Sequence, residues 1–574
     1  MLDRALGFGG SKKWGVPSPH PSPYGDLWVR GVNLERRFEA LLKSSILSHM
    51  NMSPFRGHKL SVAQIALIVA PSFILFGYNQ AGVGGLLSLP DWTKTFPEID
   101  TSHTTGTVKS HNATIQGVVV ATFVLGALTG ALSCMYTGDI FGRRKNIFTA
   151  AALTLIGEIL CSSSYALPQF MIGRTIIGLG TGVLSATVPV WQAECSSAAN
   201  RGKHVVLDGL FITLGYTLES WINLGASQIK GSNQEASWRM PLAIPISFSI
   251  ILMSCVFLMP ESPRWLIKVG RVEEARVNLS KLKDVTLDNS ILAAEIEGIQ
   301  YALEGSTVKK ASMADMFTMG PEKLFYRFCL CIMLQFYQQM SGSNLISVYA
   351  PVIFQQNLKL DSQTSRILAG GTLTWKFLSS FVAFFTIDRF GRRALFMFSG
   401  VGMGSCMLAL AVSTSFPTDN KSASIASVFF IFMFNFFVPI GFLGANFLYC
   451  AEIAPVKLRV SMASISTANH WLWNFVVVMA TPVAIANIGS HYFILFAAIS
   501  YCIPLSVYFF FPETMGQSLE QIDAVFRDNN SPLAIVKASK LLSRGDIQNI
   551  ISEKNQDITK HVEEAKINRE KDSV

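Results

Sequence analysis

Charged residues are scarce in this chain. Only 15% of its 574 residues are Asp, Glu, Lys or Arg, whereas half are hydrophobic and 41 are Phe. A soluble protein needs a wetted surface, so this composition excludes an ordinary soluble domain and requires contact with lipid. Runs such as 63–87 and 493–511 reach the roughly 20 residues that a helix needs to cross a bilayer. Because the runs are continuous and do not alternate, they exclude a membrane β-barrel.

Several chemical motifs are also missing. The nine cysteines are scattered, mostly within apolar runs and without metal-ligand spacing, so we interpret them as packing residues. No nucleotide-binding loop, metal cluster or nucleophile motif occurs, so we predict neither an enzyme nor a cofactor. The first 60 residues are polar and rich in proline, without a cleavable signal. We attribute the net charge of +9 to membrane orientation and expect no nucleic-acid partner.

The apolar runs predict an all-α membrane protein with twelve transmembrane helices. Their approximate spans are 62–87, 115–137, 147–165, 168–190, 204–226, 241–260, 327–352, 366–386, 394–413, 425–449, 461–484 and 492–511. Lys and Arg gather in the connectors after spans two, four, eight and ten, so these connectors and both termini are expected to be cytoplasmic. We therefore predict a multi-pass protein, in the plasma membrane, that acts as a monomer.

Two sequons fall in connectors on the predicted external side. They begin at Asn112 and Asn420 and are candidate glycosylation sites. The first lies almost against span two, where a glycosylating enzyme has little access.

A charged hexapeptide occurs twice, as "DIFGRR" from Asp139 and as "DRFGRR" from Asp388. "PESPR" closes span six, and "PETMG" closes span twelve. The hexapeptides lie 249 residues apart and the closing motifs 252, and repeats at such similar spacings indicate two similar six-helix halves. The predicted parts are an N-terminal tail (1–60), a first bundle (61–260), a connector with short helices (261–326), a second bundle (327–512) and a C-terminal tail (513–574) without an obvious module.

The repeated charges predict an ion-pair latch at the cytoplasmic rim. In each half an acidic residue precedes an Arg by seven positions, after span four and after span ten. The residues of the latch are Asp139, Arg143, Glu194, Arg201, Asp388, Arg392, Glu452 and Arg459. Such pairs would form in one state of a rocking cycle and break in the other. The simpler interpretation is that the charges only follow the positive-inside rule, but their doubling with acidic partners favours the latch.

Ten motifs, in order, resemble the sugar porters of the major facilitator superfamily, particularly the fungal members. They are "FGYNQAGVGGLL", "GDIFGRRK", "GRTIIGLGTG", "VPVWQAECSSAANRG", "PESPRWL", "QQMSGSNLISVYA", "DRFGRR", "LYCAEIAPVKLR", "WNFVVVMATP" and "PETMG". The likeness covers roughly residues 60 to 520. It implies two six-helix bundles and alternating-access transport of a sugar-like small molecule.

The resemblance also implies which residues contact the solute. "QQMSGSN" matches the family's sugar-contacting motif and gives Gln338, Gln339 and Asn344. Each carboxamide offers donors and an acceptor, which suits a polyol, although carboxamides also join helices. Trp471 and Asn474 match as well, with Trp471 stacking on a sugar ring or simply packing in the membrane.

The chain departs from the family pattern at several contacts. Gly209, preceded by Asp208, stands where the family has a sugar-binding Gln, and Lys376 and His470 replace Asn. Phe447 occupies a Trp position. These changes place glucose itself in doubt and favour a sugar acid or a specialised metabolite. Lys376 is expected either to pair with Asp208 or to bind an anionic solute group.

The coupling to protons is left open by the sequence. Proton-driven relatives carry an Asp in span one near an Arg in span four, whereas this chain has Asn79 and keeps Arg174. Asn cannot titrate, so facilitated diffusion is favoured unless Asp208, Glu158 or Glu219 carries the proton. Glu158 and Glu219 also fit as hydrogen-bonded structural carboxyls. A nutrient sensor on the same fold is a further alternative, although such sensors usually need a long signalling tail.

Overall fold

The computed structural model describes residues 55–86, 89–100, 104–196, 201–229, 235–304, 313–357, 361–417, 420–455, 458–517 and 519–543. These residues belong to one of two units, Phe55–Val574. The predicted tail 1–60 lies almost entirely outside them. Within the described ranges the regular structure is helical, and no strand occurs.

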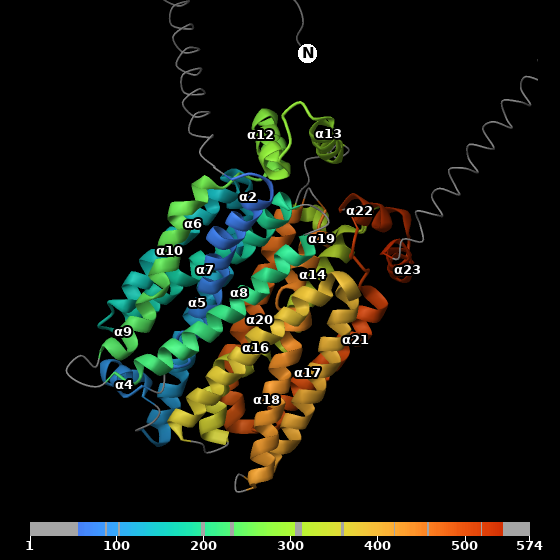
Figure 1. Cartoon of the computed structure of the whole chain (residues 1–574). Coiled ribbons are helices and arrows are strands. Elements are labelled where there is room, and N and C mark those ends of the chain that lie inside the picture. Colours follow the sequence, from blue (N-terminus) through green and yellow to red (C-terminus); the bar gives the residue numbers. More distant parts are fainter. Residues whose placement is uncertain are drawn as a thin grey trace, which may run out of the picture. The chain divides into compact units, whose positions relative to one another are not determined.

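The first half contains six helical segments at the positions of the six predicted spans, and Figure 1 shows how they are arranged. They are α2–η1–α3 (Gly57–Gln64, Ile65–Val69, Ala70–Ala81), α5 (Gly106–Ile140), α6 (Gly142–Ser162), α7 (Leu167–Cys195), α8 (Arg201–Ala226) and α9–α10–η4 (Ala236–Ala243, Pro245–Cys255, Val256–Leu258). Two short elements, α4 (Pro90–Thr95) and η3 (Pro97–Ile99), lie between the first two segments. The order agrees with the six predicted spans.

The second half repeats this arrangement. Its segments are α14–α15–η6 (Leu324–Met340, Ser343–Val352, Ile353–Asn357), α16 (Ser362–Phe390), α17 (Arg392–Ser415), α18–α19 (Lys421–Phe442, Ala445–Ile453), α20 (Arg459–Ile488) and α21 (His491–Phe510). Two of them are broken. Gly342, at φ +91°, separates α14 from α15, and Gly444 begins the turn into α19. Such breaks are tolerated in a membrane when the freed backbone lies inside the protein.

Nine helices in the described ranges are long and apolar enough to cross a membrane. The three remaining segments are α8, α14–α15 and α20, which agree in position with predicted spans five, seven and eleven. These three carry many of the buried polar side chains discussed below, which lowers their apolarity. Twelve spans in two bundles therefore fit the helices observed.

Short helices gather at one end of the bundles, which we call the connector end (Figure 1). They are α11 (Pro263–Lys268), α12 (Val272–Lys283), α13 (Ser290–Glu304) and η5 (Met313–Phe317). The predicted C-terminal tail is not featureless, because α22 (Leu519–Asp528) and α23 (Pro532–Ser543) fold there as well. Arg327 of α14 forms an ion pair with Asp523 of α22, which ties this tail to the second bundle.

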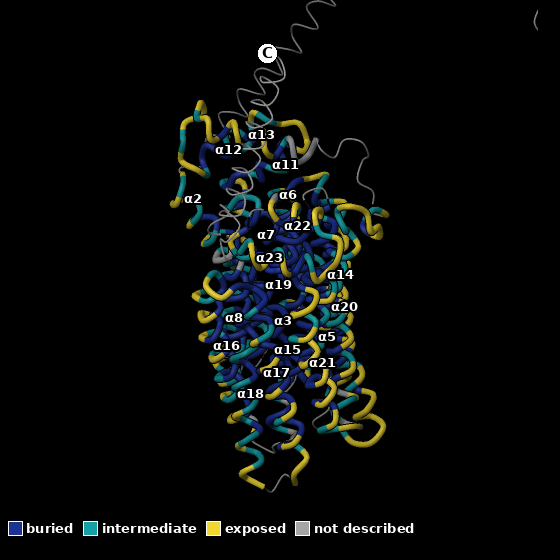
Figure 2. The backbone as a smooth tube through the Cα atoms, turned by 90° about the vertical axis from the view of Figure 1, so that its right-hand side faces the viewer, coloured by how far each residue is buried: buried dark blue, intermediate teal, exposed yellow. Residues whose placement is uncertain are grey.

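The two halves meet along their inner helices. α5 packs along α20, and α8 packs along α16. Figure 2 shows buried tube along α3 and α19, in the middle of the unit, whereas the loops at the far end from the connector are mostly exposed. Every described residue of α19 and nearly every residue of α3 is buried. Buried polar side chains on these inner helices therefore lie between the bundles.

Candidate functional site

A cluster of carboxamides lies at the break between α14 and α15. Asn344 donates from Nδ2 to Oε1 of Gln339 (2.6 Å) and to Oδ1 of Asn474 on α20 (2.9 Å). The hydroxyl of Tyr216, from α8 in the other half, donates to Oδ1 of Asn344 (3.3 Å). The structure therefore brings three predicted contact residues together and adds Tyr216 from the first bundle.

His470 lies at the centre of this cluster. Its ring nitrogens are both 3.0 Å from Nε2 of Gln339, and Nδ1 is 2.8 Å from Oε1 of Gln338. Asn446 of α19 donates to Oε1 of Gln338 (2.6 Å) and of Gln335 (3.0 Å). The sequence analysis missed Gln335 and Asn446. Gln335 was detectable because it lies one turn before Gln338, on the same face of α14.

Three polar atoms of the cluster have no hydrogen-bond partner among the described residues. They are Nε2 of Gln335, Oδ1 of Asn446 and Nδ2 of Asn474. All three side chains are fully buried. Buried polar groups are normally hydrogen-bonded, so unpartnered donors and acceptors in one place indicate a missing partner. The cluster therefore has two free NH2 donor groups and one free acceptor oxygen.

Aromatic side chains cover the cluster on the side of the first bundle. The Trp471 ring lies 5.0 Å from Phe76 and 5.7 Å from Phe123, between centroids. Its Nε1 donates to Oγ of Ser185 on α7 (3.2 Å). Phe447 lies 5.7 Å from the ring of His470. Trp471 is therefore a contact between the bundles, and its faces are occupied by aromatic neighbours in this conformation.

Lys376 lies beside the carboxamides and is almost fully buried. Its Nζ donates to Oγ of Ser347 on α15 (2.7 Å) and lies 5.3 Å from the ring centre of Tyr216. A cation–π contact and a hydroxyl stabilise an ammonium group but do not neutralise it. No carboxylate pairs with Lys376 within the described residues.

Lys376 does not form the ion pair with Asp208 that was one of the two predicted alternatives. α8 and α16 pack together, and Thr217 Oγ1 donates to the backbone oxygen of Leu373 (3.0 Å), while the hydroxyl of Thr213 donates to that of Ser380. This antiparallel register places Asp208 beyond the level of Ser380, away from Lys376. The carboxylate oxygens of Asp208 have no partner in the described part of the chain.

Gly209 allows the two halves to approach closely. A Cβ atom at this position would lie 2.8 Å from the backbone nitrogen of Gly444 and 2.8 Å from the carbonyl carbon of Leu443. Real Cβ atoms do not approach backbone so closely, so the helix α8 can meet the turn before α19 only because residue 209 lacks a side chain. The Gln that the family carries here does not fit this conformation.

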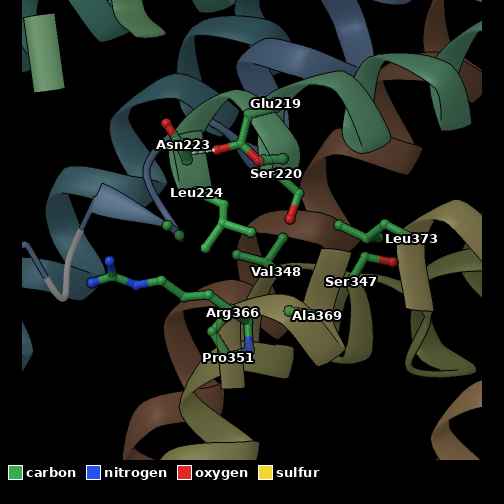
Figure 3. A pocket seen from close by; sticks show the side chains of 13 residues that line it. Glu219, Ser220, Asn223, Leu224, Ser347, Val348, Pro351, Arg366, Ala369 and Leu373 are labelled. Atoms are coloured by element: carbon green, nitrogen blue, oxygen red, sulfur yellow. Dashed lines mark hydrogen bonds between the residues drawn. The ribbon is translucent and has the colours of Figure 1, made fainter. Parts of the chain in front are cut away.

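A small cavity lies between residues of α8, α15 and α16 (Figure 3). Glu219 and Asn223 of α8 form one wall, and Arg366 of α16 reaches in from the other. Ser347, the hydroxyl that binds Lys376, also lines it. Its free volume is about 30 Å³, enough for about one water molecule. The cavity therefore lies next to the hydroxyl that binds Lys376.

Asn79 and Arg174 lie together, as the family resemblance implied, but through the backbone. Arg174 Nη1 donates to the backbone oxygen of Asn79 (2.8 Å), and its guanidinium lies 4.6 Å from the ring of Phe123. The side chain of Asn79 instead donates from Nδ2 to Oε1 of Glu158 on α6 (3.1 Å). Glu158 is therefore the carboxyl next to position 79.

Three of the charged residues predicted for the latch of the first half lie together. Arg143 contacts Glu194 with two hydrogen bonds, Nε to Oε2 (2.9 Å) and Nη2 to Oε1 (3.1 Å), and both side chains are buried. Asp139 is 3.8 Å from Arg143 and pairs more closely with Lys268 of α11 (2.8 Å). Arg459, from the second half, interacts electrostatically with Glu194. The predicted side chain of Arg201 lies outside the described residues.

The second half repeats the latch. Arg392 contacts Glu452 (Nη2 to Oε1, 3.0 Å) and Asp388 (Nη1 to Oδ1, 3.2 Å). Thr514 donates from its hydroxyl to the other oxygen of Glu452 (2.7 Å). The predicted acidic and basic partners therefore meet in both halves, and each ion pair joins helices of its own bundle.

The glycine of each repeated hexapeptide makes room for a carboxylate. Gly142 (φ +79°) and Gly391 (φ +85°) start α6 and α17. Glu261 accepts the backbone N–H groups of Arg143 and Arg144 (both 3.1 Å), and Glu513 does the same for Arg392 and Arg393. Burial raises the pKa of the Glu261 carboxyl above its usual range, although these N–H groups oppose the change.

The two sequons differ in access. Asn420 is exposed and caps α18 by accepting the N–H of Ala423 (3.3 Å). Asn112 is buried, and its Nδ2 donates to the backbone oxygen of Asp100 (2.7 Å). Because Nδ2 is the atom that a glycan would occupy, the predicted glycosylation of Asn112 is incompatible with this fold.

Comparison with known proteins supports the resemblance. Residues 65–526 match the model of the family "Sugar (and other) transporter". The sugar transporter STL1 of Saccharomyces cerevisiae is 32% identical over 88% of this chain and 89% of its own length. The transporter mfsA of Aspergillus fumigatus is 32% identical over 82% of this chain and 86% of its own length.

A solved structure shares the fold. The proton:xylose symporter XylE of E. coli, bound to 6-bromo-6-deoxy-D-glucose, superposes with a TM-score of 0.72 at 23% identity, covering 81% of this chain and 99% of XylE. The fold is therefore that of the major facilitator superfamily, and this chain belongs to its sugar transporter family, which consists of multi-pass membrane transporters rather than enzymes.

Proposed function

We propose that this protein carries a sugar or a similar polyhydroxylated solute across the membrane. The observation that carries the proposal is the carboxamide cluster with three unpartnered atoms, on Gln335, Asn446 and Asn474. Adjacent hydroxyl groups of a polyol both donate and accept hydrogen bonds, which matches two free donors and one free acceptor. The relative named as a sugar transporter supports the same solute class.

The solute moves by alternating access of the two bundles. At the connector end, Gly209 lies against the backbone of Gly444, and at the other end a Cβ atom on Gly84 would lie 2.9 Å from the backbone oxygen of Val348. The bundles thus touch on both sides of the cluster in this conformation. Separating either contact while keeping the other would expose the cluster to one side of the membrane at a time.

We place the connector end in the cytoplasm and the transporter in the plasma membrane. Arg143, Arg392 and Lys268 all lie at this end, as the positive-inside rule requires of a cytoplasmic face. Both termini would then be cytoplasmic. We propose a monomer, because each half finds its packing partner within the same chain.

A solute that carries an acidic group is the second candidate. Lys376 is buried beside the carboxamides and is held by a hydroxyl and an aromatic ring instead of a carboxylate. Arg366 lines the small cavity that Ser347, the partner of Lys376, also lines. A uronate would offer its carboxylate to Lys376 and its hydroxyls to the carboxamides, so one site serves both candidates.

Counterflow in proteoliposomes tests the function. Purified protein is loaded with unlabelled D-glucose, D-xylose or D-galacturonate, and entry of the same labelled compound is measured. Gln339→Leu removes partners of Asn344 and His470, so the concentration for half-maximal exchange should rise about tenfold, the effect of losing one or two buried hydrogen bonds. Gly225→Ala is the control, because a Cβ atom there meets open space. Failure of every compound to exchange would contradict the proposed solute class.

A further inference from the structure

Glu158 is a buried carboxyl that has no role in the proposed binding of a neutral solute. It lies in the middle of α6, is fully buried, and contacts two neutral groups, Nδ2 of Asn79 (3.1 Å) and Oγ of Ser249 on α10 (2.9 Å). No ion pair reaches it within the described residues. An ionised carboxylate without a cation is costly in such a place, so its presence calls for a reason.

The helices around α6 supply few charges. α7 contributes Arg174, whose Nε and Nη2 atoms have no hydrogen-bond partner among the described residues. α9 contributes Arg239, which is engaged with Glu235 and with the backbone oxygen of Ser162. The remaining titratable neighbours are Tyr78 of α3, whose hydroxyl binds the Pro241 oxygen, Cys161 of α6 itself, and Glu219 of α8, which acts on Arg174. Arg174 is thus the cation that Asn79 connects to Glu158.

Counting hydroxyl hydrogens shows that the Glu158 site has two proton arrangements. Thr154 donates its only hydroxyl hydrogen to the Ala151 oxygen (2.9 Å), so it must accept in its 3.1 Å contact with Ser249. In one arrangement Ser249 donates its hydrogen to Thr154, and its 2.9 Å contact with Glu158 is then a hydrogen bond only if Glu158 carries a proton and donates it; in the other, Oγ of Ser249 donates to Oε2 of Glu158.

The ionised form of Glu158 requires a different arrangement. Ser249 must then donate to the carboxylate, and Thr154 keeps its contact with Ser249 only by releasing the Ala151 oxygen. The hydroxyl hydrogens of Ser249 and Thr154 can reorient when the protonation state of the carboxyl changes, because each hydroxyl rotates about its C–O bond. The carboxyl of Glu158 therefore has a hydrogen-bond partner in Ser249 in either protonation state. The ionised state loses one local hydrogen bond, from Thr154 to the Ala151 oxygen.

We propose that Glu158 binds and releases the proton that drives transport, in place of the Asp that proton-driven relatives carry at the position of Asn79. This inference rests on the proposed transport function. Asn79 links the two parts of the site, because its side chain donates to Glu158 and its backbone oxygen accepts from Arg174. In each transport cycle Glu158 takes up a proton from the outer solution, which neutralises its carboxylate. Release of this proton to the cytoplasm restores the negative charge.

Glu158→Gln is the decisive variant. The amide keeps the size of the carboxyl, accepts from Asn79 and donates to Ser249, so it mimics the protonated form and should fold. We expect counterflow to persist, whereas accumulation driven by an imposed pH gradient falls at least tenfold and the pH dependence of transport disappears. Unaltered protein that exchanges solute but never accumulates it would overturn the role of Glu158 and leave the proposed function intact.

Infrared titration of the purified full-length protein in lipid needs no solute. The C=O band of the protonated Glu158 carboxyl should be present at low pH and disappear as the pH rises. This band should be missing in Glu158→Gln. Glu219→Gln is the matched control, because it removes another buried carboxyl near Arg174 and should leave the Glu158 band in place. Identical titrations of the unaltered protein and Glu158→Gln would overturn the proposal, even if no solute is found.

Thr154→Val separates proton binding from a structural role. Valine keeps the shape of threonine but cannot accept from Ser249, whose hydrogen is then free for the carboxylate. This favours the ionised form, so the midpoint of the infrared titration and of the transport profile should move to lower pH. A purely structural Glu158 would leave both midpoints unchanged, and a shift to higher pH would contradict the hydroxyl chain.

Discussion

The guanidinium of Arg143 meets the carboxylate of Glu194 through two hydrogen bonds of 2.9 and 3.1 Å. Arg392 meets Glu452 at 3.0 Å at the corresponding place in the other half. Bidentate or multiply bonded Arg–carboxylate contacts are among the stronger charge-assisted interactions. Both pairs are buried at the connector end, and each joins two helices of one bundle, so a movement that separates those two helices must break the pair.

The first prediction concerns this latch. Arg143→Ala leaves Glu194 buried without its partner, which costs about 3–5 kcal/mol when a buried pair is broken. We expect turnover to fall by at least tenfold with little change in the concentration for half-maximal exchange. Asp139→Asn should have a smaller effect, because Asp139 is 36% exposed and 3.8 Å from Arg143. Transport rates in proteoliposomes, normalised to inserted protein, measure both.

Lys145→Ala is the control for this prediction. Lys145 begins the same helix, but it is exposed, so its loss changes the net charge without breaking a buried pair. A normal rate for Arg143→Ala would show that the Arg143–Glu194 pair is dispensable. Equal losses for both variants would attribute the effect to the positive-inside charge.

The second prediction tests the close approach at Gly209. Gly209→Ala places a methyl group where the backbone of Gly444 lies 2.8 Å away, so α8 and α19 cannot close as they do here. We expect slower transport and easier chemical labelling of a cysteine introduced near the connector end. Gly225→Ala, on the same helix but facing open space, should behave as the unaltered protein. Wild-type activity of Gly209→Ala would mean that this contact does not form during transport.

The family motif predicted much of the cluster from sequence. The motif in span seven identified Gln338, Gln339 and Asn344, and the structure joins them to His470, a position where the chain departs from the family pattern. Gln335 and Asn446 belong to no such motif. Asn446 reaches the cluster only because the chain turns at Gly444, and no local pattern indicates where the side chains after a helix break will point.

The sequence could not predict whether Asp208 and Lys376 form an ion pair, for a different reason. α8 lies beside α16, but whether two of their residues meet depends on how far one helix is shifted along the other. That register is set by packing, as shown by Thr217 at Leu373 and Tyr216 at Lys376. A shift of two helical turns, about 11 Å, between the two helices decides whether an ion pair can form.

The third prediction concerns the solute preference set by Lys376. Lys376→Met keeps the aliphatic stem and removes the charge. If the solute is acidic, half-maximal exchange of D-galacturonate should require at least a tenfold higher concentration, while exchange of neutral sugars changes less. Competition of unlabelled compounds against a labelled one measures the preference. Unchanged competition by every carboxylated compound would exclude an anion site at Lys376.

A double-mutant cycle complements this prediction. Asp208→Asn and Lys376→Met should have additive effects on transport, because the register of α8 and α16 keeps the two residues apart. Non-additivity of more than about 0.5 kcal/mol would show that the two residues couple in another conformation.

The last prediction concerns the neighbour of Glu158. Asn79→Asp would place a second carboxyl where an amide now donates to Glu158 at 3.1 Å. Two carboxyl groups at this distance cannot both ionise freely, so the pair retains a proton to higher pH, and the midpoint of the transport profile should rise by about one to three pH units. Asn79→Ala removes the same hydrogen bond without adding a charge and should shift the midpoint by less than about one unit. If the new carboxylate instead pairs with Arg174, the Asn79→Asp midpoint will stay in place, and this outcome would separate position 79 from Glu158.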